Sequence, residues 1–540
     1  MQHKALPHIF LLLLLFIKMA PVIASSTRDT TLDQRMPLHI SPVIDLSEYC
    51  SVQERPNQNG NIAVAMAISG GGHRAANFAV GVLLGLESFT KDDVPVNILN
   101  EIDYFSTVSG GGFATGAYIS SLYDHTQSNS KTPYSFNIAL HDHNNRLLIN
   151  LERDYQSVFL ASGFNPQTFG HKDSGDVVEQ MFDDYILGAK YRKNNYSLCL
   201  GDIFQPARQN TQTSSTTNSH RRGGVSLAGL ADAAKRKQPQ PVCIAVRSTT
   251  GRPRGTAQPE AIALPFWFAN ATVYENGARF SFTPDVIKKY HTKEITHRMQ
   301  KLKLNDDCSN MPLAVAVKSS ASFPVAIPAT TFTCADPNDP LNDYLHLMDG
   351  GLIDNLGVRA AFDALQQDSA PRRILIVVDA YKGTSYPLSK NETSPCGPQA
   401  AFRITKIALD SDHTLLKHNV LIKASQSTAD GRAPIDVIFL SFEDLKPENN
   451  NKIDDIQEEL EKIRKAKANA ILRRVQREIN ITMKIKELEL NTAADVYALY
   501  NDARAIATSL NITPAEQDLL IKAGQAVVNA NRTKLQTLIQ

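Results

Sequence analysis

The feature that most constrains the fold is a local pattern that occurs twice near the start of the chain. An apolar run at residues 63–68 leads into Ser-Gly-Gly-Gly at 69–72, and apolar residues then recur at helical spacing. A second apolar run at 102–108 leads into Ser-Gly-Gly-Gly at 109–112, and a run of small and apolar residues follows. Each unit predicts a strand, a sharp glycine turn and a helix. Two such units in succession predict a parallel sheet covered by helices, which is an α/β fold.

Later segments extend this pattern. A hairpin is predicted around Gly277, a helix over 313–321, and further strands over 344–348, 374–378 and 437–442. We therefore expect one domain over 61–445, interrupted by a polar, unstructured insertion near 205–224.

The last part of the chain has a different pattern of apolar and charged residues. Apolar residues from Ile453 to Ile463 fall on one helical face, and several helical segments follow. We expect residues 446–540 to form a helical extension that packs on the core. The alternative is a module that binds a membrane or a partner, although its balanced charges argue against an anionic lipid surface.

The N-terminus has the pattern of a targeting segment. Lys4 precedes the apolar run 9–17, and Val22-Ile23-Ala24 resembles a cleavage site. We expect a cleaved signal peptide over 1–24, then a polar lead-in over 25–60, so the protein would be exported to a periplasm, a membrane surface or the outside. The alternative is an uncleaved anchor, in which Lys18 reaches the membrane surface.

Composition and cysteine spacing exclude some classes of function. The formal net charge is +1 and there is one tryptophan, so nothing favours a nucleic-acid partner. The six cysteines show no zinc spacing, and the nearest pair, Cys308 and Cys334, is the expected disulfide if one forms. The cluster His141-Asp142-His143 lacks further ligands at a telling spacing, so we predict a loop and no metal there.

The second glycine turn contains a candidate nucleophile. Ester hydrolysis by serine needs an exposed hydroxyl, a base and donors for the oxyanion. Ser109 in a strand–turn–helix supplies the hydroxyl. The amides of Gly70, Gly71 and Gly72 are candidate oxyanion donors, and Asp349, before two glycines at the end of a strand, is a candidate base. Taken singly, each of these motifs also fits an ordinary turn.

Together and in this order, the motifs resemble the patatin-like phospholipase family. Supporting segments are Asn270-Ala271-Thr272, the run from Lys318 to Pro324, and Asp349-Gly350-Gly351-Leu352-Ile353-Asp354-Asn355. The resemblance covers about residues 61–380. The chain departs from the family pattern at Thr107, where the elbow usually has Gly, and at Arg74-Ala75, which looks more like the cytosolic phospholipase A branch of the superfamily.

The resemblance implies a three-layer α/β/α hydrolase core that acts on phospholipid or another lipid ester at a membrane surface without a cofactor. It implies that Ser109 is the nucleophile, Asp349 the base of a Ser-Asp dyad, and Gly70, Gly71 and Gly72 the oxyanion donors. Arg74 is a candidate for anion or substrate binding, although a local salt bridge is the preferred interpretation.

Three alternatives stay open from the sequence. A Ser-Asp-His hydrolase requires a histidine after the acid, and His413 and His418 follow it within a predicted helix over 402–422, where we expect surface positions. Acyl transfer to an acceptor other than water uses the same groups. A non-catalytic exported scaffold of the same fold is the third alternative.

Overall fold

The computed structural model describes most of the chain between Ser41 and Leu538. The described ranges are 41–46, 61–128, 132–142, 147–155, 174–188, 197–204, 264–296, 301–324, 326–334, 343–382, 397–426, 433–446 and 493–538. All of them belong to one compact unit, Ser41–Gln540. The predicted signal peptide, the insertion at 205–224 and the amphipathic pattern at 453–463 lie outside the described residues.

The described strands form a mixed ten-stranded sheet in the order β12-β11-β1-β4-β5-β10-β9-β7-β8, with β6 paired to β5. The strands are β1 (Ile62–Ile68), β4 (Tyr104–Thr107), β5 (Phe266–Val273), β6 (Arg279–Ser281), β7 (Thr292–Ile295), β8 (Leu302–Lys303), β9 (Thr330–Cys334), β10 (Asp343–Asp349), β11 (Arg372–Asp379) and β12 (Asp436–Ser441). Strands β12 to β5 are parallel to their neighbours, and pairing turns antiparallel from β5 to β10 onward. A small hairpin, β2 (Thr90–Lys91) and β3 (Val94–Pro95), lies apart from this sheet.

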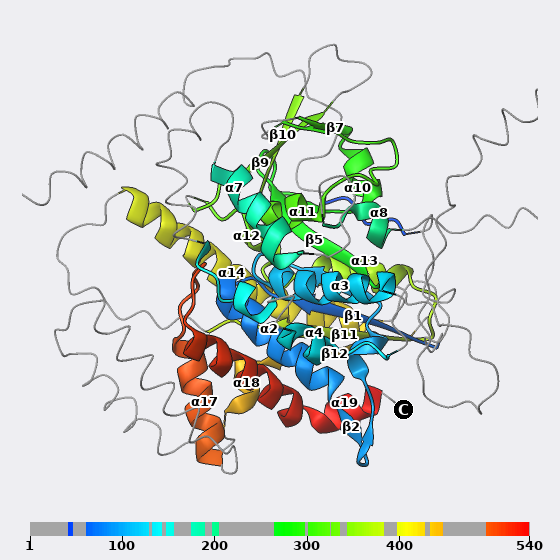
Figure 1. Cartoon of the computed structure of the whole chain (residues 1–540), viewed down its shortest axis with the longest axis vertical. Coiled ribbons are helices and arrows are strands. Elements are labelled where there is room, and N and C mark those ends of the chain that lie inside the picture. Colours follow the sequence, from blue (N-terminus) through cyan, green and yellow to red (C-terminus); the bar gives the residue numbers. More distant parts are fainter. Residues whose placement is uncertain are drawn as a thin grey trace, which may run out of the picture. The chain divides into compact units, whose positions relative to one another are not determined.

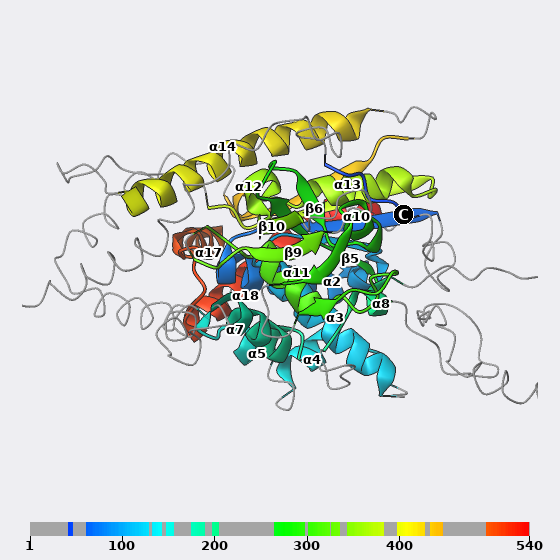
Figure 2. The same ribbon diagram turned by 90° about the horizontal axis from the view of Figure 1, so that it is seen from above.

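Helices cover both faces of the sheet (Figures 1 and 2). One layer contains α2 (Gly72–Glu87), α3 (Gly111–Gln127) and α18 (Pro514–Ala530), and the other contains α12 (Gly351–Asp354), α13 (Val358–Gln367) and α14 (Gly397–Ser425). The remaining described helices are η3 (Ile98–Glu101), α4 (Phe136–His141), α5 (Leu147–Asn150), α7 (Ser174–Met181), η5 (Phe182–Ile186), α8 (Leu200–Ile203), α10 (Pro284–Lys289), α11 (Leu313–Ser320), η6 (Phe442–Leu445), α17 (Ala493–Ala505) and α19 (Arg532–Leu538). The predicted three-layer α/β/α architecture with helices at the C-terminal end is confirmed.

The central strands are buried on both faces, which explains their continuous apolar sequences. Residues 63–68 of β1 and 373–379 of β11 are all buried. A strand that is covered by helices on both sides is apolar at successive positions, as at 63–68 and 374–378, whereas a half-exposed strand would alternate. The predicted hairpin around Gly277 is also confirmed, because β5 and β6 pair antiparallel.

Helix α18 lies directly against α2 because small residues face each other at the contact. A Cβ on Gly81 of α2 would stand 2.1 Å from Ile521 O, and one on Gly524 of α18 would stand 2.3 Å from Phe78 O. Such close approach of two helix backbones requires glycine at the contact points. The C-terminal helices therefore pack on the core, as expected.

The expected Cys308–Cys334 disulfide is wrong, because both residues are free thiols. Proximity in sequence was a poor guide here, since Cys308 lies in a turn after β8 and Cys334 ends β9.

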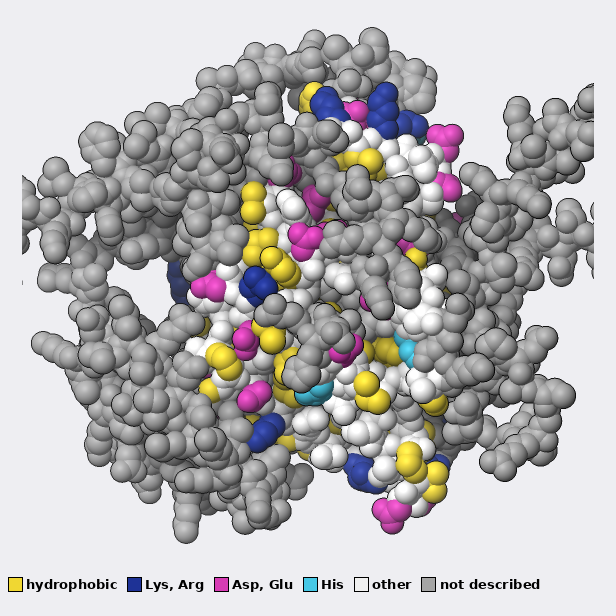
Figure 3. Space-filling model, in the orientation of Figure 1, with side chains coloured by type: hydrophobic (Ala, Val, Ile, Leu, Met, Phe, Trp, Pro, Cys, Tyr) yellow, Lys and Arg dark blue, Asp and Glu magenta, His cyan; other side chains and the backbone are white. Residues whose placement is uncertain are grey.

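No helix within the described ranges is long and apolar enough to cross a bilayer. On the face drawn in Figure 3, basic and acidic side chains are interspersed, in keeping with the low net charge.

Candidate active site

The register of the sheet brings the three predicted motifs to one level. Ile68 of β1 pairs with Thr107 of β4, and Thr107 pairs with Ala269 of β5. Two residues beyond these positions lie Gly70 after β1, Ser109 after β4 and Ala271 in β5. Ala271 is the antiparallel partner of Asp349. The glycine turn, the serine and the aspartate therefore meet beyond the end of β4, although up to 279 positions separate them in sequence.

Ser109 occupies a strained turn between β4 and α3. Its φ is +50°, a left-handed conformation that costs a non-glycine residue about 1–2 kcal/mol and recurs at functional sites. The Ser109 amide donates to Ser320 Oγ at 2.9 Å, and the Gly112 amide donates to Ser109 O at 2.9 Å. These bonds hold the turn, while the side chain stays partly exposed at the N-terminus of α3. This is the geometry of a nucleophile elbow.

The departure from the family pattern at Thr107 has a structural explanation. The Thr107 hydroxyl accepts a hydrogen bond of 2.8 Å from the indole nitrogen of Trp267, the single tryptophan of the chain. Asn270 Nδ2 also donates to Thr107 O at 3.1 Å, and its Oδ1 accepts from Ser281. Side chains of β5 and β6 thus fix the strand end from which the elbow begins.

Asp349 lies at the end of β10, buried beside the serine. Its Oδ1 accepts a 2.8 Å hydrogen bond from the Gly351 amide. Burial raises the pKa of Asp349 to about 6, and hydrogen bonds from the Gly351 amide and the Ser109 hydroxyl oppose that rise. The serine hydroxyl thus lies near enough to this carboxylate to lower its pKa, and that pKa is close to the range in which a general base works best at neutral pH.

Two of the three glycine amides in the turn, and not all three, have no acceptor among the described residues. The Gly70 amide already donates to Asn355 O at 2.9 Å, so the prediction that it is an oxyanion donor needs correction. No described residue accepts from the amides of Gly71 or Gly72. Their φ values of +144° and +58° are accessible mainly to glycine. A Cβ on Gly70 would stand 3.4 Å from Ser109 Cβ, so this turn lies against the elbow.

Arg74 has a structural position behind the turn. The side chain is buried, its Nε donates to Ala380 O at 3.0 Å, and its Nη1 donates to Ile506 O at 3.2 Å. The guanidinium thereby joins the end of β11 to the chain between α17 and α18. The neighbouring His73 is fully buried, and burial lowers its pKa to about 4, so this ring is neutral at physiological pH.

The two histidines of the alternative triad lie elsewhere. The helix predicted over 402–422 is α14, but His413 is buried, contrary to the expected surface position. Its Nε2 lies 3.0 Å from both carboxylate oxygens of Asp379, and the Tyr381 ring stacks on it with centroids 4.0 Å apart. His418 is exposed, as expected. Among the described residues, no histidine nitrogen is hydrogen-bonded to Ser109.

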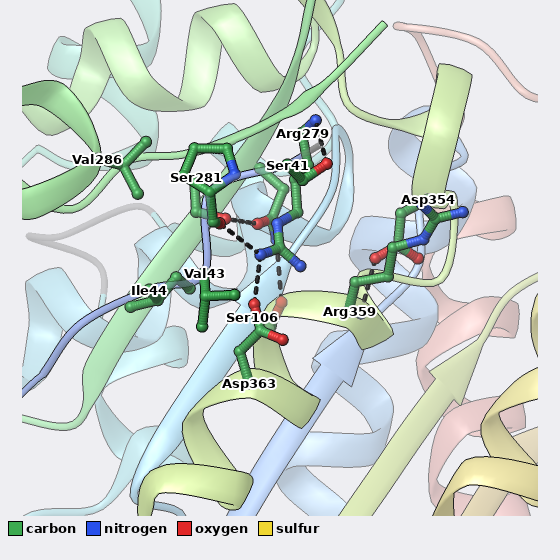
Figure 4. A network of polar contacts seen from close by, with 12 residues as sticks. Ser41, Val43, Ile44, Ser106, Arg279, Ser281, Val286, Asp354, Arg359 and Asp363 are labelled. Atoms are coloured by element: carbon green, nitrogen blue, oxygen red, sulfur yellow. Dashed lines mark hydrogen bonds and ion pairs between the residues drawn. The ribbon is translucent and has the colours of Figure 1, made fainter. Parts of the chain in front are cut away.

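A second carboxylate of the same motif has a different role. Asp354 Oδ1 accepts from the Val358 amide at 3.2 Å and Oδ2 from the Arg359 amide at 2.8 Å, which caps α13 (Figure 4). Nearby, Arg279 forms an ion pair with Asp363, and its Nη2 donates to Pro42 O at 3.1 Å. This network fastens α13 and the segment 41–46 around β6, outside the serine–aspartate contact.

Some supporting groups were not predicted. Ser320, which accepts from the Ser109 amide, belongs to the segment Lys318–Pro324 that resembles the family pattern. The sequence therefore contained a signal for this residue. Ser509 O accepts from the His73 amide at 2.9 Å, and a backbone carbonyl contact of this kind leaves no trace in the sequence. Within the described residues no group of three or more His, Cys, Asp or Glu side chains is arranged to hold a metal.

Comparison with known proteins identifies the family. No curated protein matches the chain. Among solved structures, human GIVD cytosolic phospholipase A2 is similar over 89% of this chain and 60% of its own length, with 12% identity and a TM-score of 0.36. The model of the family described as patatin-like phospholipase matches residues 66–362. Because this match extends over more than half of the sequence, the chain belongs to the patatin-like phospholipase family.

Proposed function

We propose that the protein is a lipid acyl hydrolase of the phospholipase A or lysophospholipase type that uses a Ser109–Asp349 dyad. The observation that carries this proposal is the sheet register that brings Ser109 beside the buried Asp349 carboxylate, whose pKa burial raises to about 6. The left-handed elbow supports it, and so do the amides of Gly71 and Gly72, from which no described residue accepts a hydrogen bond. The family match supports a lipid ester as the substrate.

In the proposed first step, Ser109 Oγ attacks the acyl carbonyl and its proton passes to Asp349. The oxyanion accepts hydrogen bonds from Gly71 and Gly72, and the N-terminus of α3 adds a favourable positive potential. Asp349 then returns the proton to the departing alcohol, which leaves an acyl-enzyme. Water attacks this ester after losing its proton to Asp349, and the free acid leaves as Ser109 recovers the proton.

We propose that the site hydrolyses an ester of a lipid that lies in a membrane or another lipid surface. We retain the predicted export of the protein as part of this proposal, because the apolar run 9–17 and the sequence Val22-Ile23-Ala24 support it. The head group and acyl position are left open by the proposal, since the dyad contacts only the ester.

The test is ester hydrolysis by the chain from Ser25 onward, on a soluble short-chain ester and on phosphatidylcholine vesicles. We expect Ser109→Ala and Asp349→Asn each to lose a factor of ~10³ or more in kcat. Ser128→Ala is a matched control, because Ser128 is an exposed helix-capping serine with its hydroxyl on His125 O. Its activity should equal that of the wild type. Undiminished hydrolysis by Ser109→Ala would refute the proposal, and an inactive wild type would favour the scaffold alternative.

The pH dependence gives an independent test. Asp349 must be ionised to accept a proton, so kcat/KM should rise with pH through about 6 and level off above it. A histidine base would give a similar inflection, since its ordinary pKa is about 6.5. His413→Gln separates the two, because the inflection should persist in this variant if Asp349 is the base.

A further inference from the structure

The C-terminal end of helix α11 is hydrogen-bonded to the backbone at both members of the proposed dyad. The side-chain oxygen of its last residue, Ser320, accepts a 2.9 Å hydrogen bond from the Ser109 amide. The carbonyl of Ser320 accepts a 3.2 Å hydrogen bond from the amide of Gly350, the residue after Asp349. Just beyond, the Ser322 carbonyl accepts from the Asp349 amide itself at 3.0 Å. One short segment therefore connects the serine turn to the end of β10.

The sheet by itself connects these two residues less directly. Ser109 lies two residues beyond the end of β4, and Asp349 ends β10, with β5 between the two strands. Helix α11 packs on both β5 and β10, and Ser320 is fully buried there. A buried hydrogen bond does not compete with water, so it holds its two groups in place more firmly than an exposed one. The Ser320 hydroxyl is thus a short, rigid link across β5.

This link acts at the strained residue of the elbow. The left-handed φ of Ser109 persists in a non-glycine residue only where the surroundings hold it. The amide that donates to Ser320 is the amide of this same residue. Without the acceptor, a buried N–H would lose its partner, and the turn would relax toward the right-handed region that serine prefers. That rotation would carry the Ser109 side chain away from its place beside Asp349.

We infer that Ser320 is a positioning residue for the proposed catalytic pair, because its hydroxyl fixes the Ser109 backbone while its carbonyl fixes the backbone next to Asp349. This role rests on the proposed function for its catalytic meaning. Since Ser320 is fully buried and does not reach the ester, its loss should lower kcat and leave KM unchanged. A displacement of about 1 Å between reacting groups can lower a rate about 100-fold.

The test compares Ser320→Ala with Ser319→Ala in the chain from Ser25 onward, on a soluble short-chain ester. Ser319 is the matched control, because it precedes Ser320 in the same helix and is equally buried. Its hydroxyl bonds to Val315 O at 2.6 Å and to Thr330 Oγ1 at 2.7 Å, and neither partner belongs to the dyad or its turns. Urea unfolding measures the stability that each variant loses, and Ser319→Ala should lose as much as Ser320→Ala or more.

We expect Ser320→Ala to lower kcat about tenfold or more at an unchanged KM, and Ser319→Ala to keep the wild-type kcat. The inflection of kcat/KM should also move to higher pH in Ser320→Ala. The Ser109 hydroxyl lowers the pKa of Asp349, and a displaced hydroxyl lowers it less. A general loss of stability moves neither kcat nor the inflection while the protein stays folded. Equal kcat values in the two variants would overturn the inference.

Amide hydrogen exchange measures the same link without catalysis. Amides within residues 105–113 should exchange about tenfold faster in Ser320→Ala than in the wild type or in Ser319→Ala. Equal exchange in the two variants would also overturn the inference. If no ester hydrolysis depends on Ser109, the proposed function fails and exchange alone decides. Faster exchange in Ser320→Ala would then still establish that Ser320 holds the serine turn.

Discussion

Replacing the proposed catalytic base should make the protein more stable at neutral pH. The pKa of Asp349 is about 6 in the folded protein, compared with an ordinary value of 3.8 for aspartate. One pKa unit corresponds to about 1.4 kcal/mol, so holding this carboxylate ionised in the folded state costs on the order of 3 kcal/mol. Asparagine has nearly the same shape and no charge. Its Oδ1 can still accept from the Gly351 amide, and its Nδ2 can donate to Ser109 Oγ.

The pH dependence of this effect has a definite sign. Because the pKa of Asp349 is raised on folding, its contribution to the free energy of unfolding is fully present below about pH 4 and is lost as pH rises through about 6. Asp349→Asn escapes this loss. We therefore expect the variant to exceed the wild type by ~3 kcal/mol at pH 8 and to match it near pH 4. Urea unfolding at pH 4, 6 and 8 measures the difference.

Asp354→Asn is the matched control and should have the opposite sign. This aspartate is also fully buried and burial raises its pKa, but its two oxygens accept from two backbone amides. An asparagine would set its NH₂ group against one of those N–H donors, which costs ~1–3 kcal/mol. If Asp349→Asn were as destabilising as Asp354→Asn at pH 8, or if its effect did not change with pH, the assignment of a desolvated catalytic carboxylate would be refuted.

Three further substitutions test the surroundings of the site. His413→Gln should lower the free energy of unfolding by ~3 kcal/mol, since the buried Asp379 carboxylate loses the imidazole that contacts both its oxygens and retains the Tyr381 amide and the more distant Lys417; a variant as stable as the wild type would contradict this. Gly81→Ala should lower it by ~1–3 kcal/mol, because the methyl would stand 2.1 Å from Ile521 O; unchanged urea unfolding would show that α18 can move. Trp267→Phe should cost ~2 kcal/mol and reduce kcat through the loss of the bond to Thr107, measured by urea unfolding and ester hydrolysis.

The parts of the fold that the sequence predicted are those determined by local patterns. Each predicted strand within the described residues is present, because these strands are mostly apolar and glycine turns follow several of them. The motif order also singled out Ser109 and Asp349 as a pair, and their joint role stays a prediction. What local patterns do not contain is the register between distant strands, and it is the register that places Ser109 and Asp349 level with each other.

The incorrect expectations have physical causes of the same kind. His413 was expected at the surface because histidine is polar, but it shares a helical face with Leu416 and Val420, and that spacing was a signal for burial. Burial then requires a partner, which Asp379 provides. Burial raises the pKa of Asp379, and its interactions with His413, Lys417 and the Tyr381 amide together hold the pKa below its ordinary value. The Gly70 amide failed as an oxyanion donor for a simpler reason, since a carbonyl 285 residues away accepts its hydrogen bond.

The sequence pattern changes near residue 446, but the described C-terminal helices do not form a structure independent of the core. Ser509 O accepts from the His73 amide, Ile506 O accepts from Arg74, and a Cβ on Gly72 would stand 2.2 Å from Ser509 O. The backbone between α17 and α18 therefore packs on the proposed oxyanion turn itself. Without that segment the His73 amide and the Arg74 guanidinium would lose buried partners, and the left-handed glycines would lose the surface that holds them. The C-terminal helices thus support the geometry that the proposed chemistry needs, whatever else they bind.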